Sequence, residues 1–193
     1  MAVVRGARMA VVISLPLGWC SVDVEKAIRT RRTHKAYGPA PVEPAVLREL
    51  LELARWAPNH HLTNPWRFRV LGPRTREALM ELADSQAPGS AVKLRRAPTL
   101  VAVSALTTGD AAQDREDLLA TAVGAYIVLL GAHAHGLAAY WRTVPLLDDP
   151  RARELLGMAP EEDPVGLLYL GEPVQEQRVP ERAPVGDYVV ELD

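Results

Sequence analysis

The stretch from Ala112 to His135 is the most apolar long segment of the chain, and it limits the folds that the chain can adopt. Wound as a helix, it carries apolar side chains around most of its circumference: Leu118, Leu119, Ala122, Ala125, Tyr126, Leu129 and Leu130. A helix that is apolar on several sides has to be buried on several sides. The sequence therefore predicts a central helix packed against other elements, ending at Gly136.

Shorter segments on both sides of this helix alternate between helical and strand-like patterns. The helical segments begin after Ser21, near Pro44, near Arg74 and at Pro150. The strand-like segments cover residues 66–70, 100–103, 137–143, 165–170 and 187–192. This order, with no internal repeat and no domain linker, predicts a three-layer α/β or α+β sandwich built as one domain.

Length and charge exclude several classes of protein. A chain of 193 residues is long enough for one domain with a substantial core. Its formal net charge of −2 gives no overall field that would draw it to nucleic acid or to an anionic membrane. The single cysteine, Cys20, excludes an internal disulfide and a cysteine-rich metal site. These features fit a cytoplasmic protein with no nucleic-acid or membrane partner.

The first 20 residues are expected to form an extension rather than part of the domain. A charged start is followed by the apolar run Met9 to Trp19, which mimics part of a signal peptide. The run contains Pro16 and Gly18, lacks a cleavage pattern after it, and is shorter than the roughly 20 residues that span a bilayer. We expect a disordered or strand-like arm over residues 1–20, or translation from Met9, and a single domain over residues 21–193.

The first predicted helix runs into a cationic stretch, Arg29 to Lys35, and is expected to end at Gly38 and Pro39. Four of the seven residues in this stretch are Lys or Arg, and two more are threonines. A guanidinium offers paired donors that match a phosphate or carboxylate, and a hydroxyl can add a further bond. The stretch therefore predicts a site for a small anion. The alternative is a solvated basic helix end, stabilised by the negative end of the helix dipole.

Several other mechanisms are not supported by any motif. The chain has no glycine-rich dinucleotide fingerprint, no phosphate-loop lysine motif and no glycine-flanked serine nucleophile. The pairs His60-His61 and His133/His135 lack the spacing of a metal site, so no metal is expected. Glu116 and Asp117, near the start of the long helix, are interpreted as partners of the helix dipole rather than as an acid–base pair.

Three separated stretches resemble the FMN-dependent nitroreductase family. They are RRTHKAY from Arg31, ARWAPNHHLTNPWRF from Ala54, and GLAAYWRT from Gly136 followed by LLYLGEP from Leu167. Their order and spacing match the family from about residue 21 to the end of the chain. The resemblance implies an α+β fold in which helices flank a mixed, mainly antiparallel sheet. It also implies a homodimer with FMN in two clefts at the subunit interface.

The resemblance also assigns roles to individual residues. Arg31, Arg32 and Thr33 would hold the phosphate and ribityl chain of FMN, with Lys35 nearby. His60, together with Asn59, would reach the flavin of the partner subunit. The remaining contacts implied by the family fall on Trp141, Arg142 and Thr143 beside the isoalloxazine ring, and on Arg182 at the phosphate.

The chain departs from the family pattern at four positions. Thr33 replaces the usual serine and keeps its hydroxyl, whereas Leu62 replaces an asparagine and cannot hydrogen-bond a flavin ring. Asn64 and Val144 stand where glutamine and glycine are common. These differences resemble the smaller, histidine-containing branch of the family.

Two functions remain open from the sequence. The first is an oxidoreductase that uses NADH or NADPH and FMN, in two half-reactions, to reduce nitroaromatic, quinone or similar electron-poor acceptors. Because the flavin carries this chemistry, no catalytic side chain is expected from the sequence. The second is a flavin- or anion-binding sensor or regulatory module without turnover. Trp66 is expected in the core, and Trp141 either in the core or beside the flavin.

Overall fold

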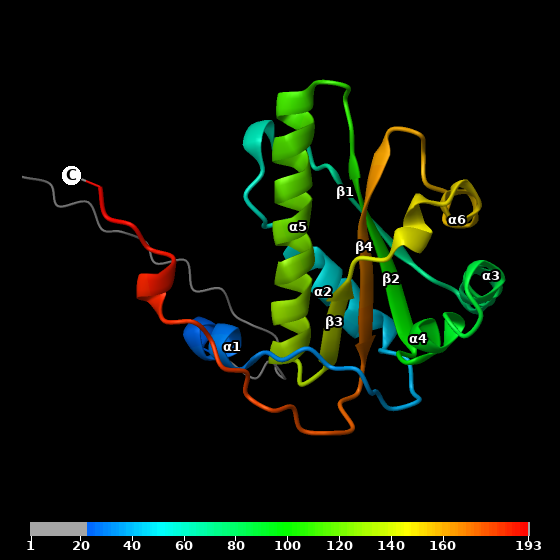
Figure 1. Ribbon diagram of the computed structural model, residues 1–193, viewed down its shortest axis with the longest axis horizontal. Helices are drawn as coiled ribbons and strands as arrows, with labels where there is room; N and C mark the ends of the chain where they lie inside the picture. The colour runs from blue at the N-terminus through cyan, green and yellow to red at the C-terminus, as the bar shows by residue number, and fades with distance from the viewer. Residues whose placement is uncertain (1–22, 193) are drawn as a thin grey trace, which may run out of the picture.

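The computed structural model describes residues 23–192 as a three-layer α+β sandwich, which confirms the predicted architecture (Figure 1). The helices are α1 (Val24–Thr30), α2 (Pro44–Ala54), α3 (Pro73–Gln86), α4 (Ala91–Arg95), α5 (Ala111–Ala134) and α6 (Pro150–Leu155). The strands are β1 (Trp66–Val70), β2 (Thr99–Leu106), β3 (Ala138–Arg142) and β4 (Glu162–Gly171). Three short helical turns complete the described elements, namely η1 (His60–Leu62), η2 (Pro145–Asp148) and η3 (Val185–Asp187).

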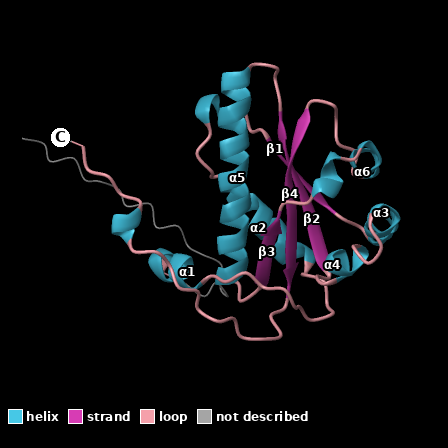
Figure 2. Ribbon diagram, in the orientation of Figure 1, coloured by secondary structure: helices cyan, strands magenta, loops and turns pink. Residues whose placement is uncertain are grey.

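The strands form one antiparallel sheet in the order β1-β2-β4-β3, visible in magenta in Figure 2. Side chains alternate between its faces, as the two-residue period of a strand requires. Along β2, Leu100 and Ala102 face α3, α4 and α6, whereas Val101 and Val103 face α2 and α5. The sheet therefore separates two hydrophobic cores.

The predicted central helix, α5, packs closely on α2 because glycine is present at the crossing. A Cβ atom at Gly131 would lie only 2.7 Å from Leu53 Cδ1. The prediction of burial on several sides holds for only part of the helix, since Leu118, Leu119 and Val123 are 40%, 58% and 41% exposed. By length and hydropathy alone α5 could cross a membrane, yet half of that apolar window is buried in the fold.

The first helix is shorter than predicted, and this moves the cationic stretch. Asp23 caps α1 by accepting a hydrogen bond from the Lys26 N–H at 3.1 Å, while the expected cap Ser21 lies outside the described residues. The helix ends at Thr30, and Arg31 already has extended backbone angles. The chain leaves the helix here because β3 offers alternative backbone partners: His34 N–H donates to Ala139 O at 3.1 Å. The stretch thus runs along a sheet edge.

The prediction of a strand over residues 187–192 is wrong, because these residues form no strand in the structure. The tail forms only the turn η3, and Tyr188, Val189 and Val190 are 69%, 52% and 79% exposed. Figure 1 shows the tail passing α1 and leading away from the sheet. A strand needs a neighbouring strand for its hydrogen bonds, and none of the described strands lies beside this segment. The proposed extension over residues 1–20 lies outside the described residues.

Candidate functional site

A cavity of about 690 Å³ lies between α1, α5 and the C-terminal tail. Its charged lining includes Arg31 and Arg32 from the start of the chain and Arg182 from the end. Tyr126 of α5 contributes an aromatic wall. The fold therefore brings together three of the predicted phosphate-binding residues that are about 150 positions apart in the sequence.

Arg31 is held in place without an acidic partner among residues 23–192. Its guanidinium carbon lies 5.6 Å from the centre of the Tyr126 ring, within the range of a cation–π contact. Its Nε atom is buried and has no hydrogen-bond partner among the described residues. Arg32 instead donates to the main chain, to Arg29 O at 2.7 Å and Arg31 O at 2.9 Å. A buried unpaired donor is costly, and this makes Arg31 a candidate for binding an anionic ligand.

Two histidines to which the sequence assigned no binding role, His34 and His133, lie close to these arginines. His133 Nε2 is 2.8 Å from the hydroxyl of Thr30, which already donates its proton to Lys26 O. His133 must therefore be the donor in this contact. Burial, followed by His133 and Arg31, lowers the pKa of His34; burial, followed by Arg31 and Arg32, lowers the pKa of His133. Burial, reinforced by the positive neighbours, therefore favours the neutral form of both histidines.

Thr33 and Lys35 lie on the same edge segment, with exposed side chains. Thr33 forms an isolated parallel bridge to Ala139 of β3, which fixes the backbone next to the sheet. The hydroxyl of Tyr37 donates to His34 O at 2.7 Å and ties the end of the segment. With the segment fixed at both points, the side chains of Thr33 and Lys35 are exposed, where a ligand could reach them.

The segment Trp141-Arg142-Thr143 does not present all its side chains to one site. Trp141 packs against the core on the α2/α5 side and donates its indole N–H to Val165 O at 3.1 Å. Gly166 makes this possible, because a Cβ there would lie 2.6 Å from the Trp141 nitrogen. By strand alternation Arg142 points to the opposite face, and Thr143 is exposed. Trp141 thus has a clear structural role.

The loop containing His60 is anchored to α5. His60 Nδ1 lies 2.6 Å from Glu116 Oε2, and its ring stacks on that of His61 with centroids 3.8 Å apart. Thr63 donates to the buried Asp117 at 2.5 Å. The interpretation of Glu116 and Asp117 as dipole partners is therefore wrong. Asp110 caps α5, and the two later acids fix the loop instead.

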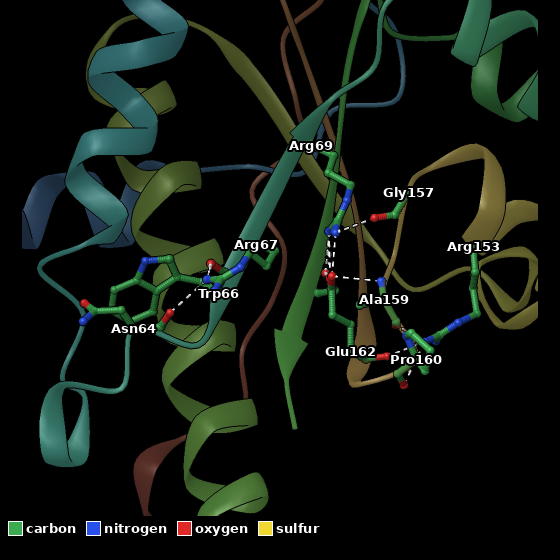
Figure 3. A network of polar contacts seen from close by, with 10 residues as sticks. Asn64, Trp66, Arg67, Arg69, Arg153, Gly157, Ala159, Pro160 and Glu162 are labelled. Carbon is green, nitrogen blue, oxygen red and sulfur yellow. Dashed lines mark hydrogen bonds and ion pairs between the residues drawn. The ribbon is translucent and has the colours of Figure 1, made fainter. Parts of the chain in front are cut away.

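Backbone strain in this loop supports a special role for it. His61, Leu62 and Asn64 all have positive φ angles, of 57°, 52° and 50°. Such angles are costly for side chains other than glycine and persist only where surrounding contacts impose them. Leu62 is 76% exposed at the tip. Figure 3 shows the end of the loop, where Arg67 donates to the carbonyls of Asn64 and the half-buried Trp66.

A second polar cluster, formed by side chains of β1, β2 and the start of β4, has its carboxylate and guanidinium paired with each other (Figure 3). Arg69 donates to both carboxylate oxygens of the buried Glu162, at 2.6 and 2.8 Å. Ser104 and the Ala159 N–H also donate to that carboxylate. Burial alone would raise the pKa of Glu162, but these hydrogen bonds outweigh it and hold the pKa at about 2. No motif predicted this network.

Within residues 23–192, no group of three or more His, Cys, Asp or Glu side chains could hold a metal ion. The chain therefore offers a cationic cavity, a strained histidine loop and a sheet-edge segment as its candidate binding features. Together they suit an anionic organic ligand better than a metal ion.

Comparisons with known proteins agree with this picture. The sequence profile of the Nitroreductase family matches residues 28–172. An NADH dehydrogenase of Thermus thermophilus is 30% identical over 199 residues, covering 85% of this chain and 93% of that protein. A nitroreductase-like family protein from Bacillus cereus has a TM-score of 0.81 at 23% identity, over 89% of this chain and 97% of that one. The NADPH:FMN oxidoreductase from Vibrio harveyi, complexed with NAD+, has a TM-score of 0.74 at 16% identity, over 86% and 76%.

Proposed function

The chain belongs to the nitroreductase family, and from that premise we propose that it is an FMN-dependent oxidoreductase. It would take electrons from NADH or NADPH and pass them to a nitroaromatic, a quinone or a similar electron-poor acceptor. The names of the relatives support this assignment, because they refer to NADH dehydrogenase and NADPH:FMN oxidoreductase activities.

The cationic cavity is the observation that carries the proposal. FMN ends in a phosphate, and Arg31 offers a buried, unpaired Nε–H beside Arg32 and Arg182. Charge-assisted hydrogen bonds to such a group are among the strongest that a protein makes. The residues present therefore fit FMN. Thr33, on the adjoining sheet edge, would add a hydroxyl at the phosphate or ribityl chain.

The contribution of the protein is binding and orientation. When bound, FMN supplies the hydride chemistry of both half-reactions. Arg31, steadied by Tyr126, would fix the phosphate end. Lys35 is the candidate for a cation beside the pyrimidine end of the ring, where it would favour added negative charge. Arg142 and Thr143 would flank the ring, whereas Trp141 would position this segment from within the core.

Exposed apolar side chains support a homodimer as the working form. They occur on α1, at Val24 and Ile28, and continue on α5 and the tail. The exposed members on the latter two elements are Leu118, Leu119, Val123, Val185, Tyr188, Val189, Val190 and Leu192. Contiguous apolar patches mark contact surfaces, and packing of these elements against a second copy of the chain would bury these side chains. In the proposed dimer, FMN lies in clefts at the interface and His60 reaches the flavin of the partner subunit.

An absorption spectrum tests the proposal. The purified protein should be yellow, NADPH or NADH should bleach the colour without oxygen, and a nitroaromatic or quinone should restore it. Colour that neither nucleotide bleaches would favour a binding module without turnover, to which the exposed Leu62 in place of a hydrogen-bonding residue would be suited. Protein that is colourless and does not bind added FMN would contradict both functions. Sedimentation equilibrium on the same sample should give the mass of two chains.

A further inference from the structure

A second cavity, of about 200 Å³, lies on the opposite side of the sheet from α5. It is formed between α3, α4 and the segment that follows β3. Lys93 and Arg142 provide its charges, and Leu94 and Val144 are among its apolar walls. It shares no lining residue with the cavity that contains Arg31.

The two cations of this cavity are not neutralised by the protein. Neither Lys93 nor Arg142 belongs to any ion pair among residues 23–192. The carboxylate beside the cavity, Asp149, accepts hydrogen bonds from the side chains of Gln86, at 2.5 Å, and Arg151, at 3.2 Å. It is therefore already engaged elsewhere. A positive, partly apolar hollow remains.

Arg142 is the more constrained of the two cations. It is half-buried, and arginines in such positions are usually paired. Behind it lies Tyr169, which is 2% exposed and whose hydroxyl lies close to the Arg142 guanidinium. Burial raises the pKa of this hydroxyl, and the nearby Arg142 acts in the opposite direction. The guanidinium thus lies against a neutral phenol, and no carboxylate of the part of the chain that the structure describes forms an ion pair with it.

We propose that this cavity is a subsite that recognises the oxyanion of a reactant, through Lys93 and Arg142, while Leu94 and Val144 contact its apolar body. The proposal rests on the proposed function, because Arg142 belongs to the segment expected beside the flavin. Its small volume, below the 300–1,000 Å³ usual for drug-sized ligands, suits a single substituted ring or one end of a larger molecule. The oxyanion is then the carboxylate of an aromatic acceptor or a phosphate of the nicotinamide nucleotide.

Substitutions on α4 test the subsite in the FMN-loaded protein. Lys93→Gln removes the exposed cation, and Lys93→Arg keeps the charge. Arg95→Gln removes another exposed cation from the same short helix, two residues away and outside the cavity lining, so it serves as the matched control. Rates would be measured with para-nitrobenzoate and with neutral nitrobenzene, and also with NADPH and with NADH. Calorimetric titration of the oxidised protein with benzoate and with 2′-AMP gives a readout besides activity.

The subsite predicts a selective loss. Lys93→Gln should reduce kcat/KM roughly tenfold for either para-nitrobenzoate or NADPH, and leave kcat/KM for nitrobenzene and NADH unchanged. Tenfold corresponds to the loss of one charged hydrogen bond. Loss for para-nitrobenzoate, with weaker benzoate binding, identifies an acceptor carboxylate. Loss for NADPH, with weaker 2′-AMP binding, identifies the nucleotide 2′-phosphate. Lys93→Arg should retain most of the preference, and Arg95→Gln should match the wild type.

The subsite is overturned if the wild type, Lys93→Gln and Arg95→Gln show the same ratio of kcat/KM for para-nitrobenzoate over nitrobenzene and the same ratio for NADPH over NADH. Benzoate and 2′-AMP would then also bind equally well to all three proteins. A wild-type protein that reduces neutral nitrobenzene while giving this result would leave the proposed function standing and remove only the subsite. A wild-type protein that holds FMN but reduces neither nitro compound nor quinone would instead contradict the proposed function.

Discussion

The polar cluster around Glu162 and the cavity around Arg31 use the same kind of residue for different purposes. Arg69 meets a buried carboxylate with two short hydrogen bonds, and the remaining acceptor capacity of that carboxylate is used by Ser104 and a backbone N–H. The cavity around Arg31 is also lined by one acidic residue, Glu25, whose ion pair is with Arg29 on the exposed surface. A charge cluster that neutralises itself serves the fold, whereas one left positive with a buried unpaired donor is suited to a ligand.

The largest expected effect is on the free energy of unfolding, when the paired cluster around Glu162 is disrupted. Glu162→Gln should lower the free energy of unfolding by on the order of 3 kcal/mol, because it leaves Arg69 partly buried without its counter-charge. Urea unfolding measures the change. Glu52→Gln removes the carboxylate of an exposed ion pair with Arg55 and should cost under about 1 kcal/mol. Similar costs for the two variants would mean that the Glu162 network is not a stabilising element.

Acid should weaken the paired cluster by a comparable amount. The pKa of Glu162 is about 2 in the folded protein, below its ordinary value of 4.5. A depressed pKa stabilises the folded state fully above the unfolded-state value, and this contribution is lost as the pH falls from about 5 through 2. The difference corresponds to about 3 kcal/mol. Between pH 6 and pH 2 the free energy of unfolding should therefore fall by about 3 kcal/mol less in Glu162→Gln than in the wild type. Parallel curves for the two proteins would contradict the depressed pKa of Glu162.

At the unpaired cluster the expected effect is on FMN rather than on the fold. Arg31→Ala should weaken FMN binding roughly 100-fold, the loss of two charge-assisted hydrogen bonds, and change stability by under about 1 kcal/mol. Arg31→Lys should recover only part of the affinity, since it keeps the charge but lacks the planar fork. Flavin titration of both variants measures this, with Arg55→Ala as the control on an exposed arginine. Equal affinities in all four proteins would remove the phosphate role from Arg31.

The smallest effect concerns the histidines close to Arg31. Their pKa values are lowered by burial and by neighbouring positive groups, and a bound phosphate should raise them. FMN binding would then take up protons, so affinity should rise by roughly threefold as the pH falls from about 8 to about 6.5. His34→Gln should flatten this dependence. Riboflavin, which lacks the phosphate, provides the control: a pH dependence equal to that of FMN would show that the histidines do not sense the phosphate.

Several elements were predictable because their signals are local. The apolar stripe of α2, the alternation in β1 and the apolar runs of β2 and β4 each lie within a short stretch, so periodicity alone located them. The family was recognisable from three motifs in order, and the family profile confirms it. The cationic stretch was also found from the sequence, although the roles assigned to its residues toward FMN stay predictions.

What the sequence missed depends on residues far apart in the chain. The end of α1 was misjudged because the competing backbone partner, Ala139, lies more than one hundred residues away. The tail looked like a strand because its apolar pattern is local, but a strand also requires a neighbour.

The sequence by itself determined the two faces of the sheet, the existence of the long apolar helix α5 and the presence of a basic segment, since these follow from side-chain order within single elements. Only the tertiary structure decided which charges are paired. Glu162 lies 93 residues from Arg69, and His133 lies 103 residues from Thr30. An ion pair or an unpaired donor is set by distances of a few ångströms between segments, and no local periodicity encodes those distances.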